Sequence, residues 1–133
     1  MTDQSYPKWI YYYLWFVTVL SSVFAVVIYV NPAAMWSHWE AATAAGAFSL
    51  AGPAGLFIAR NLGTAVMGAY ALLNKSRTMM ELVLVFRIAV DLFDGIHALI
   101  GGNPPVIYIG FGAAAVEIVM LFALRRHGLR SQA

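Results

Sequence analysis

The chain contains no cysteine among its 133 residues. Without a thiol the protein has no disulfide, no thiolate nucleophile and no metal site built on sulfur ligands. Charged residues are also scarce, because Lys, Arg, Asp and Glu make up 11% of the chain, against about 25% in a typical soluble domain. No basic stretch is interleaved with aromatic residues, so we expect no nucleic acid as a partner.

Apolar residues are abundant instead and reach 62% of the chain, which is typical of an integral membrane protein. A helix needs ~20 apolar residues to cross the ~30 Å hydrocarbon core. Four windows of that length cover residues of about 9–30, 53–74, 79–100 and 105–124. We therefore predict an all-α fold, an integral membrane four-helix transmembrane bundle that forms a single domain over residues 1–133.

The basic residues outside the windows predict an orientation. They all flank one side of the predicted bundle: Lys8, Lys75, Arg77, Arg125, Arg126 and Arg130. The opposite loops, roughly 31–52 and 101–104, contain no Lys or Arg. Because cytoplasmic loops are enriched in these residues, we expect a multi-pass protein of the inner (cell) membrane with both termini in the cytoplasm.

The first outer loop contains two tryptophans followed by many alanines, in the sequence "NPAAMWSHWEAATAAGAFSLAG". Its segment 33–48 is compatible with a short helix that lies along the membrane interface. A partly ordered loop whose tryptophans enter the lipid is the second interpretation, and the sequence leaves both open.

Five ionisable residues lie inside the windows, far from any aqueous flank: Arg60, Arg87, Asp91, Asp94 and Glu117. Each costs ~2.5–3.5 kcal/mol at the centre of a membrane helix, so they are expected to face inward and to pair. Two positive and three negative groups sum to a charge of −1. We therefore expect at least one carboxyl to hold a proton.

Helix geometry suggests which of these groups meet. Arg87, Asp91 and Asp94 follow the spacing i, i+4, i+7, which places them on one face of the third window. Depth estimated from the helical rise predicts that Arg87 meets Glu117 and also bonds Asp91. It further predicts that Arg60, together with Asn61, meets Asp91 and Asp94.

Three functions are compatible with such a cluster. The first is a membrane enzyme that performs acid/base chemistry on a small lipophilic molecule: isomerisation, epoxide opening or cyclisation. Asp91 and Asp94 would be the acid/base couple, and Glu117 would relay protons. The groups that would tune their protonation or bind substrate are Arg60, Asn61, Arg87, His97, Tyr70 and Tyr108. No cofactor is expected, and no ligand spacing supports a metal site.

The second function is a small proton-coupled transporter, in which Glu117 is the proton switch; four helices form a thin wall, so this hypothesis calls for a homodimer. The third is a non-catalytic membrane subunit or scaffold, in which the charges hold helices in register. The enzyme is favoured because the ionisable groups cluster on three windows at one depth.

Two short motifs carry a resemblance to a known family. "ARNLGTAVMGAYALL" followed by "VFRIAVDLFDG" resembles the DoxX-like group of small four-helix bacterial membrane proteins, over roughly residues 53–125. The resemblance matches Arg60 to an arginine that opens the second helix, with Asn61 where an acid is common, and Asp91 or Asp94 to a charge in the third. It implies the four-helix fold more than any activity.

Overall fold

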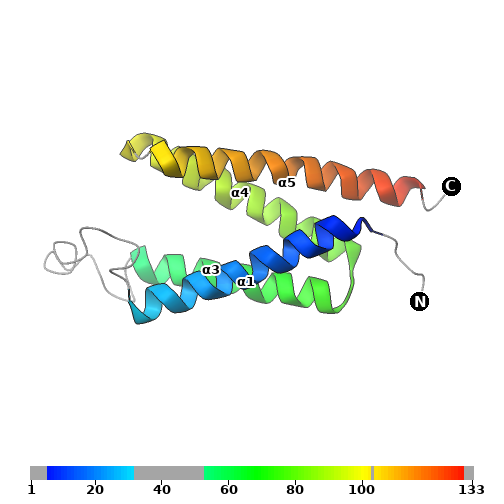
Figure 1. The fold of residues 1–133 in the computed structure, drawn as a ribbon, viewed down its shortest axis with the longest axis horizontal. Helices are drawn as coiled ribbons and strands as arrows, with labels where there is room; N and C mark the ends of the chain where they lie inside the picture. The colour runs from blue at the N-terminus through cyan, green and yellow to red at the C-terminus, as the bar shows by residue number, and fades with distance from the viewer. Residues whose placement is uncertain (1–5, 32–52, 103, 131–133) are drawn as a thin grey trace, which may run out of the picture. The chain divides into compact units, whose positions relative to one another are not determined.

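The computed structural model of the chain describes residues 6–31, 53–102 and 104–130. These residues form four α-helices, with the labels of Figure 1: α1 (Lys8–Val30), α3 (Pro53–Leu73), α4 (Arg77–Gly101) and α5 (Pro104–Arg130). The four predicted windows are thus confirmed as helices, but α5 continues well past the predicted border at residue 124. The predicted interfacial segment 33–48 lies outside the described residues.

Three of these helices are long and apolar enough to cross a membrane: Lys8–Val30, Gly55–Leu73 and Pro104–His127. The helix α4 has 25 residues, which is enough length, but it carries Arg87, Asp91 and Asp94 close to its middle. The described chain is therefore all-α, with three helices that suit a membrane. The crossing of the membrane by α4 stays a prediction.

The helix borders follow from local sequence. Pro53 and Pro104 begin α3 and α5, where a missing backbone N–H removes no intrahelical bond. Ser76 caps α4 by accepting a hydrogen bond from the Met79 backbone N–H at 3.4 Å. Gly102 ends α4 with a φ of 66°, a left-handed conformation that glycine adopts without strain.

The described chain divides into two compact units. One contains Tyr70–Ala133 together with the chain up to Leu14, and the other contains Trp15–Ala69. The first unit thus holds α4, α5 and the beginning of α1, whereas the second holds the rest of α1 and most of α3. The prediction of a single domain over residues 1–133 stays a prediction.

In the second unit, α1 and α3 pack through apolar side chains. Ala25 and Ile28 of α1 form a buried cluster with Ile58 of α3, and Phe57 packs against it. Further along, Gly68 of α3 lies against the Thr18 side chain. Because contacts that move toward the start of α1 move toward the end of α3, the two helices are antiparallel, as the chain colours of Figure 1 show.

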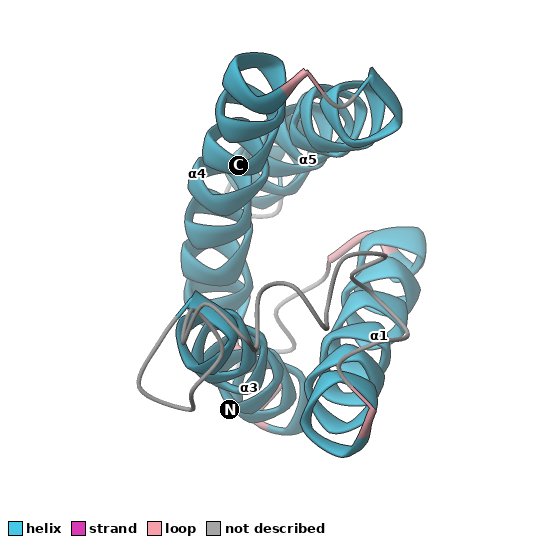
Figure 2. Cartoon of the chain, turned by 90° about the vertical axis from the view of Figure 1, so that its left-hand side faces the viewer, coloured by secondary structure: helices cyan, strands magenta, loops and turns pink. Residues whose placement is uncertain are grey.

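In the first unit, α4 and α5 form an antiparallel hairpin, and both views show them side by side (Figures 1 and 2). They approach closely at Gly110, where an added Cβ would lie 2.8 Å from the Asp91 carbonyl oxygen and 2.8 Å from the Gly95 nitrogen. The Phe111 ring covers Gly95 nearby. This close backbone contact fixes which residues of α4 face α5, and thereby positions the charged residues described next.

Candidate functional site

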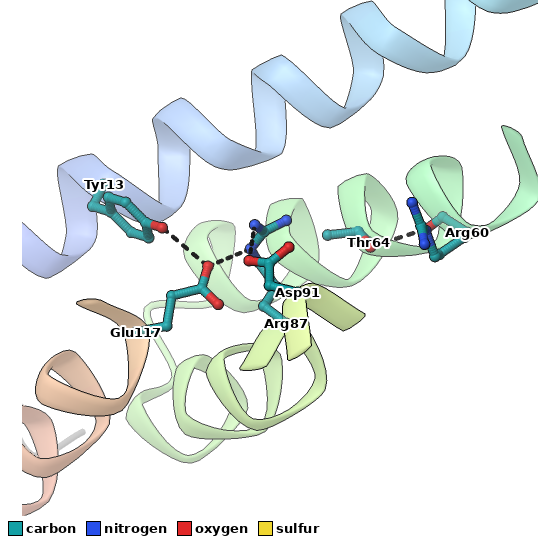
Figure 3. Close-up of polar contacts among 6 residues, drawn as sticks. All are labelled: Tyr13, Arg60, Thr64, Arg87, Asp91 and Glu117. Atoms are coloured by element: carbon teal, nitrogen blue, oxygen red, sulfur yellow. Dashed lines mark hydrogen bonds and ion pairs between the residues drawn. The ribbon is translucent and has the colours of Figure 1, made fainter. Parts of the chain in front are cut away.

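Arg87 of α4 is the centre of a polar network. Its Nε donates a hydrogen bond to Glu117 Oε1 of α5 at 2.5 Å, and its Nη2 donates to Asp91 Oδ2 at 2.8 Å (Figure 3). The side chains of Arg87 and Asp91 are 14% and 13% exposed. Both pairings predicted for Arg87, one across the hairpin and one along its own helix, are confirmed.

Tyr13 of α1 joins the same network and was missed by the sequence analysis. Its hydroxyl donates a hydrogen bond to Glu117 Oε1 at 3.0 Å (Figure 3). The run Tyr11–Tyr12–Tyr13 matches the aromatic belt of a membrane interface, and that rule does not distinguish its members. The helical stripe through the buried residues Ile10 and Leu14 does distinguish them, because it leaves Tyr12 66% exposed and turns Tyr13 partly inward.

Glu117 is the most deeply buried member of this set, which we call the Glu117 network: Tyr13, Arg87, Asp91 and Glu117. Its residue exposure is 0%. Both donors bind Oε1, whereas Oε2 is buried without a hydrogen-bond partner among the described residues. Leaving a buried polar atom unpaired costs ~1–3 kcal/mol, and more for a charged group. A buried polar atom without a partner calls for an explanation, and a bound ligand or a proton at that atom would be one.

The remaining predicted residues of the first unit are Asp94, His97, Tyr70 and Tyr108. Asp94 is half-buried one turn beyond Asp91, on the same face of α4 as Arg87. His97 is exposed. Tyr70 and Tyr108 are 57% and 77% exposed, so neither side chain lies in the buried network. Their predicted contact with a substrate, and the predicted coupling of Asp91 with Asp94, stay predictions.

Arg60 and Asn61 lie on α3, in the second compact unit. The guanidinium of Arg60 lies over the Phe57 ring, 4.7 Å from its centroid, in a cation–π contact. The Asn61 side-chain amide donates to the Phe57 carbonyl at 2.9 Å. Thr64 donates to the Arg60 carbonyl, also at 2.9 Å (Figure 3). The predicted meeting of Arg60 with Asp91 and Asp94 would join the two units and stays a prediction.

The described residues bring no three His, Asp or Glu side chains together as metal ligands would be. The Glu117 network contributes two carboxyls, one guanidinium and one phenol. A carboxyl that is held by fixed donors on one oxygen, with the other oxygen free, can give and take a proton at that second oxygen.

No family model, no curated protein and no solved structure matches this chain. The resemblance to the DoxX-like group therefore stays a prediction from two short motifs. Any function assigned to the protein has to be argued from the Glu117 network itself.

Proposed function

We propose that the protein is an integral membrane enzyme that performs acid/base chemistry on a small lipophilic molecule, with Glu117 as the acid. The observation that carries the proposal is the buried Oε2 of Glu117, which has no partner among the described residues. Ionisable residues within membrane helices are functional candidates by default because they are costly to insert. A purely structural ion pair would gain most from using both carboxylate oxygens, and Glu117 uses one.

The hydrogen bonds indicate which oxygen holds the proton. Oε1 accepts from both Tyr13 and Arg87, and accepting two bonds is the behaviour of a carbonyl oxygen. Arg87 carries one positive charge, whereas the network contains two carboxyls. We place the acidic proton of the proposed enzyme on Glu117, and Oε2 is the oxygen that is free to carry it.

This arrangement suits proton donation to a neutral substrate. The Oε2 hydroxyl gives its proton to an oxygen or an alkene carbon of the substrate, which leaves Glu117 as a carboxylate. Tyr13 and Arg87 already donate to Oε1, so the new charge forms where two donors are fixed in advance. In an isomerisation or a cyclisation a proton is then returned to the network from the substrate. Epoxide opening additionally consumes one water.

Glu117→Gln tests this role because glutamine keeps the shape and the acceptor oxygen but has no acidic proton. Lipophilic molecules that co-purify with the detergent-solubilised protein are compared by untargeted mass spectrometry. We expect one neutral compound to accumulate unconverted in Glu117→Gln and its isomer or hydrate to be found with the wild type. Glu81→Gln, which changes a carboxyl nearer the open end of the hairpin, is the matched control and should convert the compound as the wild type does, whatever its effect on bound phospholipid. Identical compounds in the wild type and Glu117→Gln would refute the proposal.

The membrane topology belongs to the same proposal, with all four helices crossing the inner membrane and both termini in the cytoplasm. The chain has no cysteine, so single cysteines report without a background. In cells, Lys75→Cys should be protected from a membrane-impermeant maleimide, and Gly101→Cys should react. Equal reaction of both positions would contradict the crossing by α4.

A proton-coupled transporter is the second candidate, and one observation favours it. Glu117 is a single fully buried carboxyl with an unpartnered oxygen, which is what a proton switch requires. In proteoliposomes a transporter would carry the co-purifying compound faster under a proton gradient, and Glu117→Gln would remove that dependence. Conversion of the compound without gradient-dependent flux would decide for the enzyme.

A further inference from the structure

A second charged cluster lies at the open end of the hairpin, near the start of α4. Glu81 accepts a hydrogen bond from Arg77 Nε at 3.1 Å on Oε1, and one from Arg125 Nε at 3.3 Å on Oε2. One carboxylate thus holds two arginines, one on its own helix and one on α5. We call this set the Arg77–Glu81–Arg125 cluster, and its formal charge is +1.

The two arginines have donors left over. A guanidinium has five N–H donors, and each arginine uses only its Nε toward Glu81. Within the described residues the Nη groups of Arg77 and Arg125 make no hydrogen bond or ion pair. Glu81 therefore fixes two guanidinium groups close together while leaving their Nη ends available. Paired guanidinium forks match the oxygens of a phosphate.

The cluster is accessible and lies in a positive environment. The Arg125 side chain is 55% exposed and that of Arg77 is 21% exposed. Lys75 and Arg126, the neighbours of these two residues in sequence, are also exposed and add positive charge. The described part of this end of the hairpin comprises the loop Asn74–Ser76 and the adjoining helix ends. Within it, Glu81 is the only acidic residue that an approaching anion meets.

Apolar side chains adjoin the cluster on the side toward the middle of both helices. Phe122 lies one turn before Arg125 on α5 and is 67% exposed, and Val119 one turn further is 63% exposed. On α4, Leu82 and Val85 are 63% and 44% exposed. A ligand here can therefore place an anionic group on the arginines and hydrocarbon along the helices, which is the chemistry of a phospholipid.

We propose that the Arg77–Glu81–Arg125 cluster binds the phosphate headgroup of an anionic phospholipid. Basic sites at the ends of membrane helices recognise such headgroups by charge and by hydrogen bonding. The predicted topology puts this end of α4 and α5 at the cytoplasmic border of the membrane. The apolar side chains next to the cluster favour a lipid over a free phosphate ion, which would leave them without a partner.

Native mass spectrometry of the detergent-solubilised protein tests the site, with phosphatidylglycerol and phosphatidylcholine as probes. We expect saturable binding of one phosphatidylglycerol, and weaker binding of phosphatidylcholine. Arg77→Gln and Arg125→Gln should each lower the bound phosphatidylglycerol by about fivefold or more, because each removes charge-assisted hydrogen bonds. Arg126→Gln is the matched control, since it removes the same charge without touching Glu81, and it should stay within about twofold of the wild type.

Equal losses in Arg125→Gln and Arg126→Gln would overturn the site in favour of diffuse surface charge, and equal binding of both lipids would overturn headgroup recognition. An excess of inorganic phosphate should leave the bound lipid in place; displacement by phosphate would show that the site takes the ion alone. Arg125→Lys controls for misfolding, because it keeps a positive charge beside Glu81. It lacks the forked N–H donors of the guanidinium, so it should still bind less lipid than the wild type. Lipid binding by Arg125→Lys that equals the wild type would also refute the proposal.

Discussion

The two helix pairs of this chain hold together by different means. In α1 and α3 the contact is apolar, through Ala25, Ile28 and Ile58, all less than a tenth exposed. In α4 and α5 polar side chains also meet across the pair, Arg125 with Glu81 and Arg87 with Glu117. In lipid an apolar contact gains little over the contact with hydrocarbon that it replaces. The contact between α4 and α5 is the more specific one, because each buried polar group in it is costly unless its own partner is in place.

Each pair also has a glycine at a close approach, and the two glycines differ in what they face. Gly110 of α5 faces backbone atoms of Asp91 and Gly95, which cannot move without displacing the helix. Gly68 of α3 faces the Thr18 side chain, which can be shortened by a substitution without moving the helix. The hairpin of α4 and α5 should therefore tolerate change less than the pair of α1 and α3. The following predictions test this difference, from the largest effect to the smallest.

Arg87→Met should be the most damaging single change. It removes the cation that both Asp91 and Glu117 contact, and breaking a buried ion pair on one side costs about 3–5 kcal/mol. The free energy of unfolding, measured by circular dichroism in mixed detergent micelles, should fall by that amount. The triple variant Arg87→Met/Asp91→Asn/Glu117→Gln removes all three ionisable groups and should recover most of the loss. No recovery would mean that Arg87 contributes by its packing instead of its charge.

Gly110→Ala should cost about 1–3 kcal/mol, because the new methyl group meets backbone 2.8 Å away and forces the helices apart. Gly112→Ala is the matched control two residues along α5. Its Cβ meets nothing within 4 Å, so it should be neutral or stabilise by up to ~1 kcal/mol through helix propensity. Equal unfolding free energies for the two variants would contradict the close approach at Gly110.

Gly68→Ala should cost about 1 kcal/mol, less than Gly110→Ala, because its methyl group meets a side chain. The obstacle is the Thr18 hydroxyl, and Thr18→Ala removes it. The double variant Thr18→Ala/Gly68→Ala should therefore be more stable than Gly68→Ala alone, as measured by the same unfolding experiment. A double variant that loses the sum of the two single losses would show that Gly68 and Thr18 act independently.

Tyr13→Phe should have the smallest effect, about 1 kcal/mol, since it removes one hydrogen bond to Glu117 and keeps the ring. Tyr12→Phe is the control, because Tyr12 is 66% exposed and its change should lie within measurement error. If Glu117 is the acid of the proposed enzyme, Tyr13→Phe should also slow conversion of the co-purifying compound. A loss of stability equal in both tyrosine variants would remove Tyr13 from the network.

Sequence reasoning reached much of this fold because helix borders depend on local signals. Pro53 at the start of α3 and Gly102 at the end of α4 are border signals that can be recognised in the sequence. The length of each apolar window predicts the rest of the helix. The Arg87 pairs were also predictable, because depth and the i, i+4 spacing constrain a charge that must find a partner. Tyr13 was not predictable in the same way, since a tyrosine near an interface is stable with or without a buried partner.

Two features of the site depend on side-chain geometry that a sequence does not encode. One is the choice of a single Glu117 oxygen by both donors, which leaves Oε2 unpaired. The other is the contact of Arg125 with Glu81, which exists because α5 continues as a helix to Arg130. Sequence alone assigned Arg125 to an aqueous flank, and such a residue has no reason to hold a fixed partner.

If α4 crosses the membrane as proposed, the bond between Arg87 and Asp91 bears on how the chain is inserted during synthesis. The two residues are four apart on one helix, so they can pair before any later part of the chain has emerged. A pair that is already neutral lowers the cost of passing α4 from the insertion machinery into lipid. Glu117 is synthesised after α4, and its carboxyl can then accept a hydrogen bond from the Nε of Arg87, which the bond to Asp91 does not use. Insertion in this order would let the ion pair of Arg87 and Asp91 form before the contact with Glu117 is made.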